Sequence, residues 1–214
     1  MTASPKGIPQ LTLHWSPKSP YVRKVMVAAH ELGLADHITR VRSVTSMLAP
    51  NADLLPYNPL SKIPTLIVEG FGPLYDSLTI CEYLDHLTGE QRLFPPGGTE
   101  RWRALLWHSL GDGLLDIIIL WRNEREKEPA IQFGTWLDAF RLKTTLALDT
   151  LNAIAPDLAA APFGIGHIAI GCCLSYVDFR FADLDWRAGR PALCAWHAQF
   201  SARPSVQATE ISGG

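Results

Sequence analysis

Alternating apolar and polar residues near the N-terminus predict a strand, and a helical pattern follows it. Leu11, Leu13 and Trp15 alternate with polar residues, as a half-buried strand requires. The next apolar residues recur three or four positions apart, which is the spacing of one face of a helix. They are Val22, Val25, Met26, Ala29 and Leu32. We therefore expect a strand at 11–15 and a helix that Gly33 ends.

Capping residues mark where this first helix begins. Ser19 has the side chain of an N-cap, and Pro20 then occupies the first helical position, where proline is favoured. Beyond the helix, residues 37–44 form a second strand pattern. Residues 46–57 are expected to be irregular or to form a short helix.

The next segment predicts a hairpin that leads into a helix. Thr65 to Glu69 is β-branched and apolar, and Gly70 to Pro73 is a turn cluster. Leu74 and Tyr75 then begin an antiparallel strand. Asp76 and Ser77 are both N-cap residue types, and Gly89 is a C-cap candidate. The helix between them carries its apolar stripe at Ile80, Cys81, Leu84 and Leu87.

Taken together, these elements give a βαβαββα order up to residue 89. Such an order predicts a mixed sheet whose first two strands are parallel and whose last two form an antiparallel hairpin. Residues 90–97, which include Pro95 and Pro96, are the best candidate for a linker. The sequence thus predicts an α/β domain at 10–89 and an all-helical domain at 98–209.

Every pattern in the second half is helical. The expected elements are a long helix at 102–121 ended by the charged run 122–129, a second helix at 133–151, a loop at 156–162, a buried helix at 168–181 and a short helix at 191–200. The last helix should turn Leu193, Trp196 and Phe200 inward, and the tail from Pro204 is polar.

Composition and charge exclude several classes of protein. Apolar residues make up 47% of the 214 residues and charged residues 19%, as in ordinary soluble proteins. A net charge of −2 gives no reason to expect nucleic-acid binding. Histidines and cysteines are not clustered, so we expect no metal. No apolar run reaches the roughly 18 residues of a membrane span.

The cysteines and the N-terminus point to one compartment. The four cysteines have no C-x-x-C spacing, and three of them lie in apolar helical stretches, so we expect buried free thiols in a reducing environment. The N-terminus has no apolar core of a signal peptide. The prediction is a cytoplasmic protein without membrane association.

Two local features predict a binding site for a peptide-like ligand. Pro64 lies at the mouth of a strand, so the backbone of Ile63 forms an unpaired edge with which an extended peptide could pair. Asp76 and Ser77 bring a carboxylate, a hydroxyl and free N–H groups to a helix N-terminus, which suits an α-amino acid. Each feature also has a plain structural explanation, as a loop end and as a helix cap.

The chain as a whole resembles a cytosolic glutathione transferase over roughly residues 11–209. Ser-Pro-Tyr-Val-Arg-Lys at 19–24 resembles the active-site turn of serine-type members such as the tau and zeta classes, where omega-like members carry cysteine. Asn-Pro-Leu-Ser-Lys-Ile-Pro-Thr-Leu at 58–66 is similar to the family's cis-proline segment, and the Asp76-Ser77 pair to its glutathione signature. Residues 176–181 and 203–205 resemble the second half of bacterial members.

The resemblance implies a thioredoxin-like first domain that binds glutathione as a co-substrate. Ser19 would donate a hydrogen bond to the glutathione thiolate, with Ser16 as the alternative hydroxyl. Ile63, before a cis peptide bond at Pro64, would pair with the cysteinyl part. Lys62 would approach the glycyl carboxylate. The remaining pair, Asp76 and Ser77, would hold the γ-glutamyl end.

The same resemblance implies a partner electrophile and a homodimer. The reaction would be attack of the activated thiol on a small electrophile held by the helical domain. Alternatives are a glutathione-dependent isomerase of the zeta (maleylacetoacetate isomerase) type, a dehalogenase, or a non-catalytic binding protein with this fold. Candidates to face the electrophile are Trp107, His108, Asp112, Leu115 and Arg122, none of them favoured. Tyr176 and Arg180 are expected to be satisfied structural groups.

One segment departs from the family pattern. Members usually begin the buried helix of the second domain with Ser or Thr and place Asp three residues later, whereas this chain reads Gly164-Ile-Gly-His167. Gly164 is an acceptable cap, but the reciprocal acid is missing. We therefore expect an effect on stability and not on chemistry.

Overall fold

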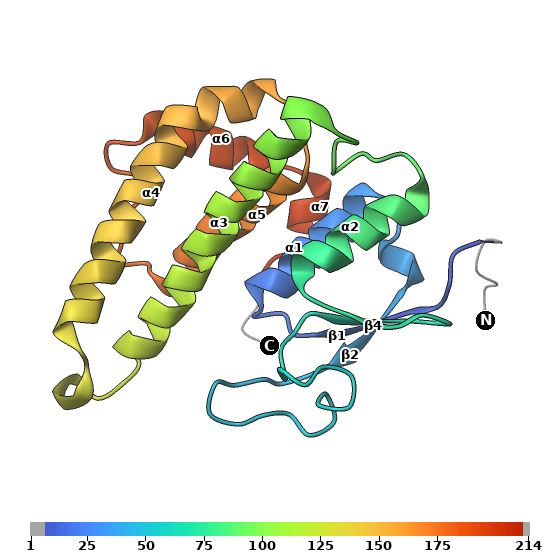
Figure 1. Ribbon diagram of the computed structural model, residues 1–214. Helices are drawn as coiled ribbons and strands as arrows, with labels where there is room; N and C mark the ends of the chain where they lie inside the picture. Colours follow the sequence, from blue (N-terminus) through green and yellow to red (C-terminus); the bar gives the residue numbers. More distant parts are fainter. Residues whose placement is uncertain (1–6, 212–214) are drawn as a thin grey trace. The chain divides into compact units, whose positions relative to one another are not determined.

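The computed structural model describes residues 7–211, which form two compact units (Figure 1). The first unit comprises the described residues up to Pro96 together with those from Pro204 onward, and the second comprises Gly97–Arg203. The sequence had placed residues 204–209 with the helical domain. They belong with the first unit because Arg23 donates a hydrogen bond to the carbonyl of Val206 at 3.2 Å.

The sheet of the first unit has the predicted parallel first pair and antiparallel hairpin, and the structure adds the pairing of the first strand with the third. Its strands are β1 (Leu11–Trp15), β2 (Ile38–Arg42), β3 (Thr65–Val68) and β4 (Gly72–Leu74). They lie in the order β2-β1-β3-β4, with β1 parallel to β2 and both other pairs antiparallel. The thioredoxin-like mixed sheet is therefore confirmed. The strand β4 starts two residues earlier than predicted, because Gly72 and Pro73 pair with β3 instead of forming the turn.

Two long helices complete the first unit. They are α1 (Pro20–Glu31) and α2 (Ser77–Thr88), with the 3-10 turn η1 (Ala35–His37) and the short α7 (Pro204–Gln207). The apolar stripes of α1 and α2 are buried, as the periodicity predicted, except that Leu87 at the end of α2 is only half-buried. Gly89 ends α2 in the left-handed conformation, with φ of 70°.

The connection between β2 and β3 contains turns and no regular helix. The βαβαββα order predicted from the sequence has its second helix in this segment, at residues 46–57, and the structure has no helix there. Leu54 is the buried apolar anchor of this segment. Asn58, which is 1% exposed, organises the loop that follows, so the chain reaches β3 through side-chain hydrogen bonds and not through a helix.

The second unit is all-helical, as predicted. Its elements are α3 (Gly98–Arg125), η2 (Pro129–Ile131), α4 (Gly134–Ala160), α5 (Ile165–Arg180) and α6 (Pro191–Ser201). The helix α5 is buried along most of its length. Leu193, Trp196 and Phe200 face the core from α6, as predicted.

Glycines allow the helices to approach α5 closely. A Cβ on Gly111 of α3 would lie 2.6 Å from the backbone nitrogen of Ile170, and one on Gly166 would lie 2.6 Å from the Cβ of Trp107. Separations that short require something to shift. The α3–α5 packing therefore depends on these glycines, which the apolar pattern alone did not single out.

The predicted loop at 156–162 is wrong in its first part. The helix α4 continues through Pro156 and ends at Ala160. Proline removes one hydrogen bond to the preceding turn, but only one turn of helix remains beyond it. Ala155 and Leu158 are buried at 2% and 1% exposure, so packing holds this last turn in place.

The helix α3 is long and apolar enough to cross a membrane by length and composition alone. Buried core helices of soluble proteins have the same property, so this is weak support for a membrane span. In this protein Leu114, Leu115, Ile118 and Trp121 of α3 are buried among the other helices of the unit. The absence of membrane association stays a prediction.

Candidate functional site

The register of the sheet brings three predicted site segments to one end. His14 near the end of β1 pairs with Thr65 at the start of β3, and Leu74 at the end of β4 pairs with Leu66. If the pairing is continued by one residue beyond His14 and by two residues beyond Leu74, Pro64 lies between Trp15 and Asp76. Neighbouring strands lie about 4.8 Å apart, so the three segments span roughly 10 Å. A fully extended tripeptide has about this length.

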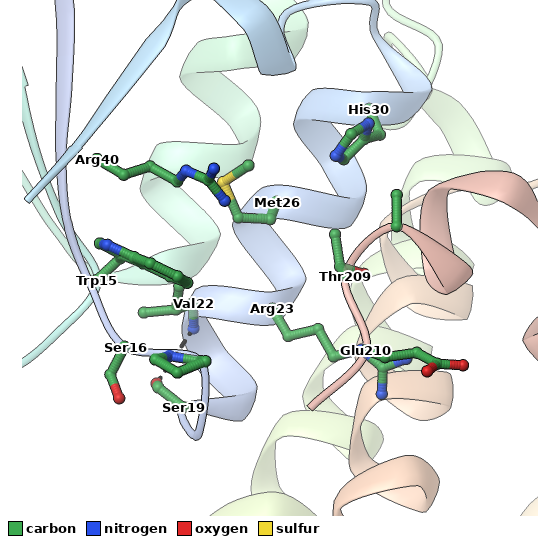
Figure 2. A pocket seen from close by; sticks show the side chains of 12 residues that line it. Trp15, Ser16, Ser19, Val22, Arg23, Met26, His30, Arg40, Thr209 and Glu210 are labelled. Atoms are coloured by element: carbon green, nitrogen blue, oxygen red, sulfur yellow. Dashed lines mark hydrogen bonds between the residues drawn. The ribbon is translucent and has the colours of Figure 1, made fainter. Parts of the chain in front are cut away.

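Ser19 caps the helix α1 at this end of the sheet. Its backbone is extended, with φ of −84° and ψ of 118°, and its Oγ accepts a hydrogen bond from the Val22 N–H at 3.3 Å (Figure 2). Pro20 occupies the first helical position, as predicted. The Oγ–H of Ser19 has no acceptor within residues 7–211, so it is available to a ligand.

Ser16 lies in the loop before the helix. Its Oγ accepts a long hydrogen bond of 3.4 Å from the Lys18 N–H. The Ser16 carbonyl accepts one from the Ser19 N–H at 3.2 Å. Both hydroxyls are therefore near the start of α1, but only Ser19 occupies the cap, where the helix dipole and the free N–H groups act together.

The peptide bond between Ile63 and Pro64 is cis, as predicted. The Asn58 side-chain amide donates to the Lys62 carbonyl at 3.1 Å and to the Thr65 Oγ1 at 2.9 Å. Thr65 in turn donates to the Lys62 carbonyl at 2.8 Å. Within the described residues, the Ile63 backbone forms no hydrogen bond, so its N–H and C=O are an open edge.

Asp76 and Ser77 open the helix α2, as predicted. Asp76 is the N-cap: its Oδ1 accepts hydrogen bonds from the Leu78 N–H at 3.0 Å and the Thr79 N–H at 3.5 Å. The other carboxylate oxygen, Oδ2, has no partner within the part of the chain that is described. Ser77 is 2% exposed and begins the helix. A carboxylate oxygen and a hydroxyl are therefore both available at this cap.

Lys62 is the least constrained of the predicted residues. Its side chain is exposed, and only its backbone carbonyl takes part in the Asn58 network. The structure thus places Ser19, Ile63, Pro64, Asp76 and Ser77 at one end of the sheet with Lys62 at its margin. Sequence reasoning missed Asn58 as the residue that shapes this loop; its position at the start of the proline-rich segment was the available signal.

A pocket of about 170 Å³ runs along α1 from the two serines (Figure 2). Its lining residues are Trp15, Ser16, Pro17, Ser19, Val22, Arg23, Met26, His30, Arg40, Ala208, Thr209 and Glu210. Residues 62–64 and 76–77 do not line it. The pocket is therefore a second space that starts at Ser19 and leads away from the edge of Ile63.

His14 is buried near the end of β1, close to the site. It is 7% exposed, its Nδ1 lies 2.9 Å from the Ser43 Oγ, and its ring centroid is 5.4 Å from that of Tyr57. Burial lowers the pKa of the His14 imidazole, so the ring is neutral near pH 7. The alternating pattern had placed this residue on the polar face of the strand.

The candidates for contact with the electrophile lie mostly in the core of the helical unit. Trp107, His108 and Leu115 are buried, at 7%, 4% and 0% exposure. The Arg122 guanidinium donates to the Tyr176 hydroxyl at 2.8 Å, which confirms Tyr176 as a satisfied structural group. Arg180 is only partly satisfied: its guanidinium lies 4.4 Å from the centroid of the Phe179 ring, but its buried Nε has no hydrogen-bond partner.

Metal ligands are not gathered in the described part of the chain. Within residues 7–211, no group of three or more His, Cys, Asp or Glu side chains is placed to hold a metal ion.

Comparison with known proteins found a match for each of the two units. The profile of the glutathione S-transferase N-terminal domain matches residues 18–87, and that of the C-terminal domain matches residues 135–199. A solved structure of a glutathione transferase family member from Pseudomonas fluorescens Pf-5, with bound glutathione, is 42% identical to this chain, with a TM-score of 0.91. The match covers 94% of this chain and 99% of that one. The chain belongs to the glutathione S-transferase family.

Two further matches to this glutathione S-transferase family member also come from bacteria. The Pseudomonas protein has a second structure, with bound S-(propanoic acid)-glutathione, at 41% identity and a TM-score of 0.87, covering 94% and 100% of the two chains. The uncharacterized GST-like protein YibF of Escherichia coli K12 is 29% identical over 196 residues, which are 90% of this chain and 94% of YibF. The family assignment predicted from the motifs is confirmed.

Proposed function

We propose that this protein is a glutathione transferase that binds glutathione at the end of the sheet and activates its thiol for attack on an electrophile. The observation that carries the proposal is the collection of three complementary groups within roughly the length of an extended tripeptide. These are the Ser19 cap, the open edge of Ile63 before its cis-proline, and the Asp76-Ser77 cap. The relative from Pseudomonas fluorescens, which binds glutathione, supports the same ligand.

Each part of glutathione has a matching group. Asp76 Oδ2 and the Ser77 hydroxyl suit the ammonium and carboxylate of the γ-glutamyl end. The Ile63 backbone suits the extended cysteinyl backbone, because an antiparallel peptide would pair with both its N–H and its C=O. Lys62, at the margin, suits the glycyl carboxylate.

Thiol activation follows from the position of Ser19. A free thiol has a pKa of about 8.5 and is mostly protonated at neutral pH. The N-terminus of α1 stabilises a nearby negative charge, as it does for catalytic cysteines at helix starts. The Ser19 Oγ–H donates a further hydrogen bond to the thiolate, and donation to the charged form lowers the pKa of the bound thiol. The thiolate sulfur then forms the new bond to the electrophile.

We also propose a homodimer and a cytoplasmic location. Cys81, Cys172 and Cys173 are buried and none of the four cysteines forms a disulfide, which suits a reducing compartment. Three large apolar residues, Phe71, Trp102 and Leu106, are strongly exposed, which suits burial against a second copy.

Calorimetric titration with glutathione tests the site. Asp76→Ala and Ser77→Ala are each expected to raise the Kd for glutathione tenfold or more, about 1.4 kcal/mol, and to slow the chemical step less. Asp76→Asn separates binding from folding, because asparagine is an equally good N-cap but lacks the charge. It should weaken binding while leaving the unfolding free energy nearly unchanged. An unchanged Kd in all three variants would rule out this site.

A further inference from the structure

One peptide group in the loop before β3 is held by a closed set of hydrogen bonds. The Lys62 carbonyl accepts from the Asn58 Nδ2–H at 3.1 Å and from the Thr65 Oγ1–H at 2.8 Å. The Asn58 Nδ2 also donates to the Thr65 Oγ1 at 2.9 Å. The three polar atoms therefore form a triangle, and each of its sides has an ordinary hydrogen-bond length.

The triangle uses every donor of its two side chains. Both hydrogens of the Asn58 amide and the hydroxyl hydrogen of Thr65 are donated within it. The Asn58 Oδ1 accepts from the Leu60 N–H at 3.0 Å, which fixes the orientation of the amide. Asn58 and Thr65 are 1% and 0% exposed, so neither side chain can touch a ligand. Any influence that they have on binding acts through the peptide group that they hold.

Buried neighbours attach the triangle to the rest of the first unit. Thr65 is the first residue of β3 and pairs with His14 of β1. The Asn58 N–H donates to the carbonyl of Leu54 at 2.9 Å, and the Leu54 side chain is fully buried. The peptide group between Lys62 and Ile63 is therefore fixed relative to the sheet, although it lies in a loop.

The held carbonyl determines where the Ile63 N–H points. The Lys62 C=O and the Ile63 N–H belong to one trans peptide group, in which they point in opposite directions. Because the C=O points inward to Asn58 and Thr65, the N–H points away from them, toward the open edge. Two hydrogen bonds to the carbonyl also polarise the peptide group, which makes its N–H a stronger donor.

We propose that Asn58 and Thr65 are positioning residues for glutathione, because they aim and polarise the Ile63 N–H that donates to the carbonyl of the cysteinyl residue. This inference deepens the proposed function and rests on it, since that function assigns the cysteinyl backbone to Ile63. Loss of the triangle weakens this one contact and leaves the contacts at the γ-glutamyl end and at the thiol in place.

Two ligands that differ at the cysteinyl carbonyl test the proposal by calorimetry. They are γ-glutamylcysteine amide and γ-glutamylcysteamine, which lacks the carboxamide but keeps the thiol and the γ-glutamyl end. The wild-type protein should bind the amide about tenfold more tightly, as expected for one peptide hydrogen bond. The ratio of the two Kd values is the readout, because general damage to the site changes both values alike.

Thr65→Val and Thr65→Ser are a matched pair at this buried position. Valine has the shape of threonine without the hydroxyl, whereas serine keeps the hydroxyl and loses a methyl group. Thr65→Val should reduce the ratio to about threefold, and Thr65→Ser should keep it near tenfold. Asn58→Ser, checked for folding by circular dichroism, removes both amide donors and should bring the ratio close to one.

Ser61→Ala is the control for general loosening of the loop. The Ser61 Oγ accepts from the Asn51 N–H at 2.7 Å in the same loop, but it takes no part in the triangle. This variant should keep the wild-type ratio. A tenfold ratio in Thr65→Val would overturn the proposal, and so would a fall in Thr65→Ser or Ser61→Ala as large as that in Thr65→Val.

Titration with glutathione itself separates this inference from the proposed function. If the wild-type protein binds glutathione but Thr65→Val keeps the tenfold ratio, the positioning role is wrong and the proposed function stands. If the wild-type protein does not bind glutathione, the proposed function is wrong and this inference fails with it.

Discussion

At the scale of single residues, Ser19 combines a structural and a chemical role in one hydroxyl. Its oxygen accepts the Val22 N–H and so caps α1, while its hydrogen has no acceptor within the described chain. The cap uses a lone pair and the proposed thiolate contact uses the proton, so the two roles do not compete. Substitution separates them, because stability reports the first role and the pH dependence reports the second.

Replacement of Ser19 by alanine should raise the pH midpoint of conjugation. Loss of the hydroxyl removes a hydrogen bond to the charged form, so the pKa of bound glutathione rises and more base is needed to form the thiolate. The rate of conjugation as a function of pH is the measurement. The loss of the cap should also cost about 1 kcal/mol of stability. Ser16→Ala is the control and should leave the midpoint in place.

Ser19→Cys gives the converse test of the same position. A cysteine at a helix N-terminus has a lowered pKa and is itself a nucleophile, so it should form a mixed disulfide with oxidised glutathione. Conjugation should be lost, a disulfide reductase activity should appear, and mass spectrometry should find glutathione at position 19. A wild-type pH profile for Ser19→Ala, together with no glutathionylation of Ser19→Cys, would transfer the role to Ser16.

At the scale of elements, the helix α5 has a histidine, His167, as its third residue, where the family pattern has aspartate. The His167 Nδ1 accepts the Gly164 N–H at 3.1 Å, and its Nε2 lies 2.9 Å from the Leu158 carbonyl. Nδ1 must therefore be unprotonated, and the Nε2–H donates. The reciprocal half of the capping box is thus present with imidazole as the acceptor, which corrects the expectation that it was missing.

This cap should make the stability of the protein sensitive to mild acid. Burial, with a contribution from the charge of Arg203, lowers the pKa of the His167 imidazole below its usual 6.5. The unfolded chain therefore binds a proton before the folded protein does. The stabilisation is complete above about pH 6.5 and is lost as the pH falls from there toward the folded-state pKa.

Urea unfolding of wild type and His167→Gln at two pH values tests this prediction. At pH 7.5 the wild type should be more stable by about 1 kcal/mol, and at pH 5.5 the difference should shrink. His14, whose pKa is also lowered by burial, contributes to both proteins and cancels in the comparison. His86→Gln, at an exposed position on α2, is the control. A gap that is the same at both pH values would contradict the prediction.

At the scale of the whole molecule, exposed apolar residues occur on both units. Trp102 and Leu106 are 71% and 67% exposed and lie one turn apart on α3. In the first unit Phe71, at the hairpin turn, is 67% exposed. Large apolar residues that lie together on a surface often mark a protein interface. The proposed homodimer, with the first unit of one chain against the helical unit of the other, would bury such residues.

Light scattering at micromolar concentration should give about twice the monomer mass of 23.6 kDa. Leu106→Glu should shift the protein toward the monomer, because a charge at an apolar interface is costly to bury. Leu146→Glu, at an exposed apolar position on α4, is the control and should leave the dimer intact. A wild-type mass near that of the monomer would contradict the prediction.

Much of the site could be predicted from the sequence, because its parts are local. The caps at Ser19 and Asp76 and the strand start at Pro64 depend on residues next to them in the chain. At each of these positions the residue is of a type that few other local structures favour. Their gathering at one end of the sheet was decided by the strand order of the structure, since the pairing of β1 with β3 and of β3 with β4 fixes which residues are neighbours.

Only the tertiary structure decided the features that join distant residues. The helical turn beyond Pro156 persists because buried neighbours hold it, against its local preference. The pocket along α1 joins Arg23, Arg40 and Glu210, which no periodicity relates. Local propensity acts over one or two turns of chain, whereas packing and charge act between residues that the fold brings together. The sequence by itself therefore determined the family and the motifs of the proposed glutathione site, and the tertiary structure decided which side chains meet beside them.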